Sequence, residues 1–552
     1  MQRTPRAHRL AVVLAVAVAL GAEVLACAGG TRDRDAAHAG ADGAPADDAS
    51  AGDDTGRDAW VKPDAMGAIY AENCAVCHGA NLEGAAQGPS LRADPLAHGA
   101  SIDELVASIA DGYPQARMPA WRGVIADDDL RGLAIYLAEK RRGDPGPDGY
   151  GVGAAPVVPT GIVHSELHDF EIELVWSGLE EPYSIAPLPD GGILATEKMR
   201  GLLRIDPARG TATRVTGTPR FYDDAPMRGT MYAGQGWAHE VALHPRYAEN
   251  GWIYLSYGDR CDGCNAASRA SGAPVSMLKL VRGRLDGARW VDEETVWEAP
   301  RESYEVGVEN GISARIEFDD ADRVYLTVGV LADYRKVQDL REPFGKILRV
   351  RDDGSIPDDN PFLDVPGALP AIYTLGHRNA QGLAFDRRTR TMWSSEHGPR
   401  GGDETNLVRA GANYGWPLVS LGVDYDGRPI HYAEEYGIAF DPADLTGPVL
   451  DWTPSPGLSS MVFYEGDAFP RWRGQLLQAS LAATKLVRVV TDGASARRAE
   501  TLLEGIGRLR DVEVAPDGTV LLLVEHRAGS LVLRLVPASP PRPAATASTP
   551  ED

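Results

Sequence analysis

The chain has 552 residues and a formal net charge of -24. Its length predicts about two to four domains, and its acidity excludes charge-driven binding of nucleic acid or of an anionic membrane surface. With only five cysteines, it is not a disulfide-dense scaffold.

The first residues predict a secretory signal peptide, which we place at residues 1–26. Arg3, Arg6 and Arg9 precede an apolar run from Leu10 to Leu20. This run is too short to be a membrane-spanning helix. We therefore expect an exported, periplasmic protein.

Cys27 follows Val24-Leu25-Ala26, which resembles a bacterial lipobox. The resemblance implies a lipid anchor on Cys27 in the inner or outer membrane, whereas ordinary cleavage would leave a free thiol. We expect no other contact with the membrane. Residues 27–58 are mostly Ala, Gly and Asp without an aromatic side chain, so they predict a disordered tether.

Residues 59–142 have a globular composition and contain Cys74-Ala-Val-Cys-His78. In such a motif two thiols bind haem covalently and the adjacent imidazole binds its iron, so we predict a c-type haem. Met118 is the expected second axial ligand. The alternatives are His98 as that ligand and Met118 as a core residue.

A closing helix is expected from Asp128 to Arg142, with Asp127 or Asp128 as its N-cap. Together with the haem motif, it resembles a small class I cytochrome c domain, which implies an all-α fold for residues 59–142. The resemblance implies that the loop Gly88–Leu91 packs beside the haem and orients His78. Residues 143–160 are rich in Gly and Pro and predict a linker.

Residues 161–537 repeat one unit, a short apolar strand, an Asp- or Gly-rich turn and a second strand. Copies begin 51 to 78 residues apart, at Ile185, Val241, Ile316, Leu383, Met461 and Val512. Six such units predict an all-β, six-bladed propeller. A pair of β-sandwiches is the alternative. Residues 538–552 predict a disordered tail.

Three long motifs in this region carry a family resemblance. They are Gly376-HRNAQ-Gly382, Glu396-HGPRGGD-Glu404 and Gly411-ANYGW-Pro417. They resemble the glucose/sorbosone dehydrogenase family over about residues 165–536. The resemblance implies a six-bladed propeller that oxidises an aldose sugar with pyrroloquinoline quinone (PQQ) and calcium.

The same resemblance implies the residues that bind PQQ. Arg508 and Arg510, two positions apart on one strand, would hold its carboxylates, for which forked guanidinium donors are well suited. Arg378 and Asn379 would lie near the quinone oxygens, and Gln235 would line the pocket.

Calcium is expected at the backbone carbonyls of Gly398 and Pro399, because this ion takes oxygen ligands. It would act as a Lewis acid beside the quinone. Asp403 matches a family position close to the reacting centre.

The sequence departs from the family where the catalytic base is expected. Gly311, in Glu309-NGISA-Arg315, occupies the position of the usual histidine, and Gly329-Val330 replaces the family's Gly-Asp. Glu309, Asp403 or His239 could serve as the base instead. Alternatively, the substrate could be more acidic or already hydrated.

A third explanation is a degenerate propeller that binds a ligand or partner beside an electron-carrier domain. The fused cytochrome favours an active dehydrogenase that passes electrons to its own haem and then to a respiratory acceptor. A hydrolase is a further alternative that no motif favours. Cys261 and Cys264 predict a loop disulfide, with a metal site as the alternative.

Overall fold

The computed structural model describes residues 64–143, 156–221, 238–259, 277–304, 313–330, 333–526 and 529–538. The predicted signal peptide, tether and Cys27 lie outside the described residues, as do Gln235, Cys261, Cys264, Glu309 and Gly311. Residues 144–155 of the predicted linker and 539–552 of the predicted tail also lie outside them. Within the described part of the chain, no helix is both long and apolar enough to cross a membrane.

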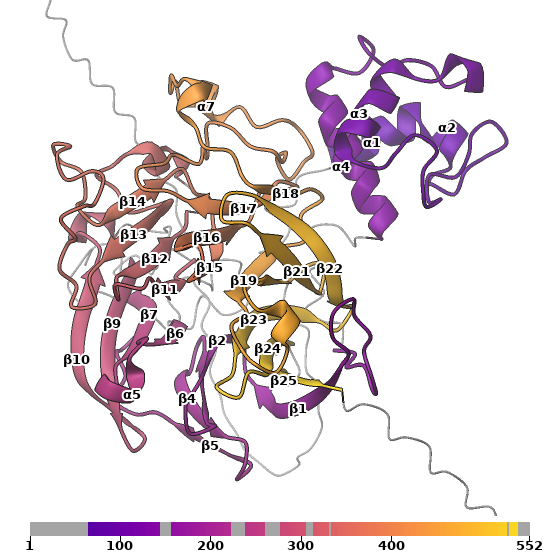
Figure 1. Cartoon of the computed structure of the whole chain (residues 1–552). Helices are drawn as coiled ribbons and strands as arrows, with labels where there is room; N and C mark the ends of the chain where they lie inside the picture. Colours follow the sequence, from indigo (N-terminus) through magenta and orange to yellow (C-terminus); the bar gives the residue numbers. More distant parts are fainter. Residues whose placement is uncertain are drawn as a thin grey trace, which may run out of the picture. The chain divides into compact units, whose positions relative to one another are not determined.

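The described strands form six antiparallel sheets of four strands each, the blades of a propeller (Figure 1). Blade 1 contains β2 (Pro182–Pro187), β3 (Ile193–Glu197), β4 (Gly201–Asp206) and β5 (Thr211–Arg214). Blade 2 contains β6 (Ala238–Leu243), β7 (Ile253–Asp259), β9 (Met277–Asp286) and β10 (Arg289–Glu298). Blade 3 contains β11 (Ile316–Phe318), β12 (Val324–Val328), β13 (Lys346–Val350) and β14 (Ile372–Leu375). Blade 4 contains β15 (Ala380–Asp386), β16 (Thr391–Glu396), β17 (Asp403–Val408) and β18 (Leu450–Trp452). Blade 5 contains β19 (Leu458–Phe463), β20 (Leu476–Ser480), β21 (Lys485–Thr491) and β22 (Ala496–Glu504).

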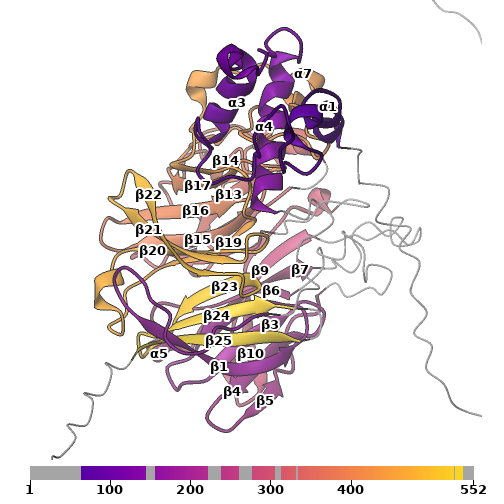
Figure 2. The ribbon, with the colours of Figure 1, turned by 90° about the vertical axis from the view of Figure 1, so that its right-hand side faces the viewer.

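Blade 6 joins the two ends of the propeller region. It contains β23 (Arg508–Val514), β24 (Val520–Glu525), β25 (Ser530–Pro537) and β1 (Phe170–Leu179). Strand β1 pairs antiparallel with β25, and Figure 2 shows the two side by side. The first strands of the blades, β2, β6, β11, β15, β19 and β23, contact one another in that circular order. The prediction of a six-bladed propeller is confirmed.

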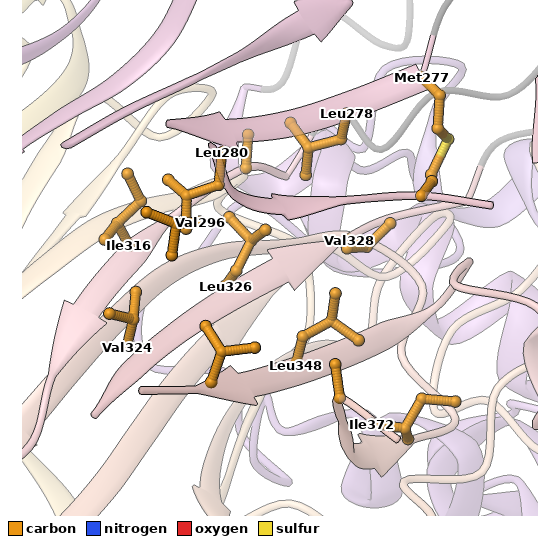
Figure 3. Packing of buried hydrophobic residues seen from close by; sticks show 14 of the residues in the cluster. Met277, Leu278, Leu280, Val296, Ile316, Val324, Leu326, Val328, Leu348 and Ile372 are labelled. Atoms are coloured by element: carbon orange, nitrogen blue, oxygen red, sulfur yellow. The ribbon is translucent and has the colours of Figure 1, made fainter. Parts of the chain in front are cut away.

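Apolar side chains between neighbouring blades form the core. Leu278 and Leu280 of β9 pack with Ile316 of β11 and Leu326 of β12, in one cluster shared by blades 2 and 3 (Figure 3). These side chains alternate along their strands, so that one face of each sheet meets the next blade. This packing fixes the inner strands, among them β23, which carries Arg508 and Arg510.

The region of the haem motif is helical, as predicted. Its helices are α1 (Ala65–Asn73), α2 (Ala75–His78), α3 (Ile102–Asp111) and α4 (Asp127–Arg142), with a 3-10 turn at Pro114–Ala116. Helix α4 matches the predicted closing helix, but the expected cap is wrong. Ala126 is the N-cap, and the three aspartates fill the first turn, where they favour the positive end of the helix dipole.

Short helical turns lie in the loops of the propeller. They are α5 (Tyr247–Asn250), α7 (Tyr432–Glu435) and 3-10 turns at Arg301–Ser303, Tyr334–Gln338, Pro442–Asp444 and Pro470–Trp472.

Candidate functional site

The haem motif lies where α1 passes into α2. The His78 Nδ1 atom is 2.9 Å from the carbonyl oxygen of Pro89. Because a carbonyl can only accept, Nδ1 carries the proton and Nε2 keeps its lone pair for a metal. Gly88 packs so closely that a Cβ there would lie 2.7 Å from the Cys77 carbonyl oxygen. The loop Gly88–Leu91 therefore orients His78, and the donor set fits a covalently bound haem.

The two candidates for the second axial ligand differ in their surroundings. Met118 is half-buried, and its backbone pairs with Tyr113 through hydrogen bonds of 2.9 and 3.1 Å. His98 stacks on the Tyr113 ring, with centroids 3.7 Å apart. Stacking engages the face of the imidazole and leaves the in-plane lone pair of a ring nitrogen free, so His98 stays the alternative ligand. Met118 stays our predicted ligand.

Arg378 brings the three family motifs together. It follows β14, is 7% exposed, and donates to the Gly398 carbonyl oxygen at 3.0 Å and to the Tyr425 hydroxyl at 2.9 Å. Its guanidinium also lies 5.5 Å from the centroid of the Trp416 ring. Among the described residues, its Nε has no hydrogen-bond partner. A buried cation with an unsatisfied donor suits an anionic or carbonyl-bearing ligand.

Asn379 lies beside Arg378 in a polar network. Its Oδ1 accepts from Ser313 Oγ and from Gln381 Nε2, both at 2.9 Å. The altered pair Gly329-Val330 lies next to it. A Cβ on Gly329 would approach Ser313 Oγ to 2.7 Å, and the Val330 amide donates to the Arg378 carbonyl at 2.9 Å. The fully buried Val330 thus places an apolar side chain where the family has a carboxylate.

A second cationic group forms around Glu525 of β24. Arg508 and Arg510 of β23 approach its carboxylate to 3.5 and 2.7 Å, so the two arginines share one side of the strand. Lys198, which follows β3, lies 2.7 Å from the same carboxylate. All four side chains are at most 11% exposed. Three cationic side chains gather around one carboxylate, and forked guanidinium donors of this kind suit a polycarboxylate ligand.

The charges in this group shift one another's titration. Burial alone would raise the pKa of Glu525, but Arg510, Lys198 and Arg508 together hold it well below its usual range. Burial lowers the pKa of Lys198, against the attraction of Glu525. Sequence reasoning missed Lys198 and Glu525, because neither lies in one of the long motifs quoted above.

Asp403 supports the turn expected to bind calcium. Its two carboxylate oxygens accept from the amides of Gly398 at 3.0 Å and Leu458 at 2.9 Å. Burial raises the pKa of Asp403 to about 6, against these hydrogen bonds. Its contacts are those of a structural carboxylate. The turn itself offers backbone oxygens, and a carbonyl that accepts from Arg378 retains a second lone pair for a cation.

Two histidines lie near the cations. His239, a candidate base, is 1% exposed and packs edge-on against Tyr183 with centroids 5.1 Å apart. Burial, aided by Lys198, Arg315 and Arg510, lowers the pKa of His239 to about 3. His397, which sequence reasoning did not select, contacts the Leu458 carbonyl oxygen through Nε2 at 2.5 Å, so its Nδ1 is an acceptor. That Nδ1 lies 3.5 Å from Asn379 Nδ2.

Arg315, at the end of the segment that lacks the usual histidine, joins strands of several blades. Its Nη1 lies 2.6 Å from Glu240 Oε2 and 3.0 Å from Asp511 Oδ1. It also donates to the carbonyl oxygens of Gln381 at 2.8 Å and Arg510 at 3.0 Å. Burial raises the pKa of Glu240 to about 8 despite this pairing. Arg315 is therefore a structural hub rather than a ligand-binding group.

Two family models match separate parts of the chain. The model of the glucose/sorbosone dehydrogenase family matches residues 179–533, and that of the cbb3-type cytochrome c oxidase subunit III family matches residues 61–137. The aldose sugar dehydrogenase YliI of Escherichia coli is 32% identical over 365 residues, 65% of this chain and 91% of that protein. The quinoprotein glucose dehydrogenase B of Acinetobacter calcoaceticus is 25% identical and covers 68% of this chain and 89% of its own length.

Two further matches separate the domains. The apo crystal structure of the Escherichia coli aldose sugar dehydrogenase has a TM-score of 0.58 and 30% identity, and covers 67% of this chain and 100% of that chain. Cytochrome c55X of Paracoccus denitrificans is 34% identical over 77 residues, 14% of this chain and 73% of that protein. The chain therefore belongs to the glucose/sorbosone dehydrogenase family, and it carries a cytochrome c domain before its propeller.

Proposed function

We propose that this chain is a periplasmic, PQQ-dependent dehydrogenase that oxidises an aldose sugar or a related alcohol and passes the electrons to its own c-type haem. The observation that carries the proposal is the buried group of Lys198, Arg508 and Arg510 around the single carboxylate of Glu525. Clustered guanidinium and ammonium groups are suited to bind a ligand that carries several carboxylates. PQQ is such a ligand, with three carboxylates.

The residues divide the binding of the cofactors between them. Lys198, Arg508 and Arg510 would hold PQQ carboxylates, while Arg378 and Asn379 would face the quinone oxygens. The carbonyls of Gly398 and Pro399 would bind calcium. Once bound, PQQ would supply a two-electron acceptor and calcium a Lewis acid.

The proton of the substrate hydroxyl needs an acceptor, which contributes roughly 10²–10⁴ in rate. Asp403, Glu309 and His239 stay the candidates. The hydrogen bonds to both Asp403 oxygens make it the less suited of the two described candidates. The second proposal for function is a degenerate propeller that binds a ligand without turnover, and it is favoured by Val330 in place of a carboxylate.

Export and anchoring belong to the same proposal. The predicted signal peptide at residues 1–26 would direct the chain to the periplasm, where haem is attached. A lipid on Cys27 would hold it at a membrane, and a respiratory electron acceptor would reoxidise the haem.

The test uses the haem-loaded chain without its signal peptide, supplied with calcium, PQQ and a panel of aldoses. Binding of PQQ is measured by fluorescence, and turnover by reduction of a soluble dye. We expect turnover that requires both PQQ and calcium. Binding without turnover would establish the degenerate propeller instead. Failure to bind PQQ would overturn the dehydrogenase and leave a propeller that binds some other ligand.

A further inference from the structure

Arg400 lies in the Glu396–Glu404 motif, next to Pro399, and pairs with the cytochrome domain. Its Nη2 is 2.7 Å from Glu139 Oε2 on α4, and its Nη1 is 3.2 Å from Asp64 Oδ1, the N-cap of α1. The Arg400 side chain is only 9% exposed. The helices of the cytochrome domain and the propeller belong to one compact unit of the chain. A buried ion pair between two domains requires a defined mutual orientation.

Hydrogen bonds to backbone carbonyl oxygens of the propeller surround this ion pair. The Ala65 amide donates to the Asp426 carbonyl oxygen at 2.9 Å, and Arg131 donates twice to the Leu421 carbonyl oxygen, at 2.9 and 2.7 Å. At the end of α4, Arg142 donates to the carbonyl oxygens of Pro454 at 3.2 Å and Ser455 at 3.0 Å. The contacts therefore run from the first turn of α1 to the last turn of α4.

The two surfaces also approach each other closely at two glycines. A Cβ added at Gly132 of α4 would clash with the carbonyl oxygen of Gly427, and a Cβ at Gly427 would clash with the Met66 side chain. Val423 packs into the apolar core of the cytochrome domain and is 2% exposed. Close backbone approach and a shared apolar core indicate a specific interface rather than a chance contact between two domains joined by a linker.

The propeller side of this interface also builds the candidate cofactor site. Arg400 directly follows the predicted calcium carbonyls, and Tyr425, in the loop that receives α1, binds Arg378 through its hydroxyl at 2.9 Å. The cytochrome domain thus rests on the same two loops that position Arg378 and the Gly398–Pro399 turn.

We propose that Arg400, paired with Glu139 and Asp64, docks the cytochrome domain on loops 398–402 and 421–428, so that the haem receives electrons from a fixed position. This inference rests on the proposed dehydrogenase function. Oxidation of one hydroxyl to a carbonyl releases two electrons and two protons. The protons go to solvent, and the haem iron carries the electrons singly to an external one-electron acceptor.

The test compares three variants of the full chain. Glu139→Arg places two cations together and should open the interface. The double variant Glu139→Arg/Arg400→Glu restores the attraction with the charges exchanged. Asp128→Arg makes the same charge change at an exposed position of α4 and serves as the control. The absorption spectrum of the haem checks that each variant retains a folded cytochrome domain.

Hydrogen–deuterium exchange reports docking without any catalysis. In Glu139→Arg we expect exchange at residues 421–428 and at the Ala65 amide to increase by roughly tenfold or more, since tethering alone gives only a finite local concentration. Asp128→Arg should resemble the wild type. The double variant should exchange more slowly than Glu139→Arg but faster than the wild type, because its new carboxylate at position 400 faces Asp64. Unchanged exchange in Glu139→Arg would overturn the interface.

Rapid mixing with sugar then reports the electron path. Haem reduction should slow about tenfold or more in Glu139→Arg, whereas reduction of a soluble dye should stay at the wild-type rate. If haem reduction in Glu139→Arg were as fast as in the wild type although the interface is open, the haem would not need a fixed position to receive electrons. Absence of dye reduction in every variant would instead refute the dehydrogenase function, while the exchange data would still test the docking.

Discussion

Two buried arginines near the inner strands differ in the groups that satisfy them. Arg315 binds the carboxylates of Glu240 and Asp511 and two backbone carbonyls. Arg378 donates to carbonyl oxygens and a tyrosine hydroxyl, and among the described residues it forms no ion pair with a carboxylate. The first charge is neutralised within the protein. In the described part of the chain, no carboxylate lies within ion-pair distance of the second, which suits a group that is completed by a ligand.

The largest expected effect is on the neutralised arginine. Arg315→Met leaves Glu240 and Asp511 buried without their cation, which should cost about 3–5 kcal/mol of stability. Calorimetry should show the propeller transition at a much lower temperature. If Arg315→Met lowered the stability no more than Arg378→Met does, the two arginines would not differ in this way.

The pH dependence of stability sharpens the same side of the comparison. The pKa of Glu240 is raised to about 8, so the folded chain binds a proton that the unfolded chain releases above about pH 4.5. Stability should therefore fall as the pH rises from about 4.5 to about 8. Glu240→Gln should remove a part of this fall, on the order of a few kcal/mol. Glu298→Gln, at an exposed position, should leave the curve unchanged.

Arg378, which we expect a ligand to complete, should behave in the opposite way. Arg378→Met should change stability by less than about 1 kcal/mol but weaken PQQ binding by roughly 10- to 150-fold, the value of a charged hydrogen bond. Titration with PQQ, followed by calorimetry or fluorescence, measures the dissociation constants of the wild type and the variant. Thermal unfolding measures their stabilities. Wild-type affinity in this variant would place the cofactor elsewhere.

The smallest expected effect concerns Lys198. Lys198→Met should weaken PQQ binding by about tenfold, because it removes one of three cations without removing the forked donors of the arginines. Lys279→Met, which changes a lysine paired with Glu298 in blade 2, is the matched control. Equal affinities in both variants would limit the binding group to Arg508 and Arg510.

The repeat predicted the fold well, because each copy begins at or near the first strand of a blade. Ile185, Val241, Ile316 and Val512 lie in β2, β6, β11 and β23. The closure of blade 6 could not be predicted, because β1 pairs with a strand more than 350 residues away. Repetition encodes local strand pairs and leaves no signal for such a contact.

The site was predictable where its residues share motifs, and less so elsewhere. Arg378, Gly398 and Trp416 belong to the three long motifs, and the structure brings them together. Lys198 and Glu525 come from separate blades and meet only through the closed ring. Arg315 could be aligned from sequence, but its structural role depends on carboxylates of other blades.

The most direct measurement is the rate of haem reduction after the PQQ- and calcium-loaded chain is mixed with sugar, without an external acceptor, over a range of protein concentrations. The account predicts reduction at a first-order rate that does not depend on protein concentration, because the site and the haem share one chain. A rate proportional to protein concentration, or no sugar-dependent reduction, would contradict it.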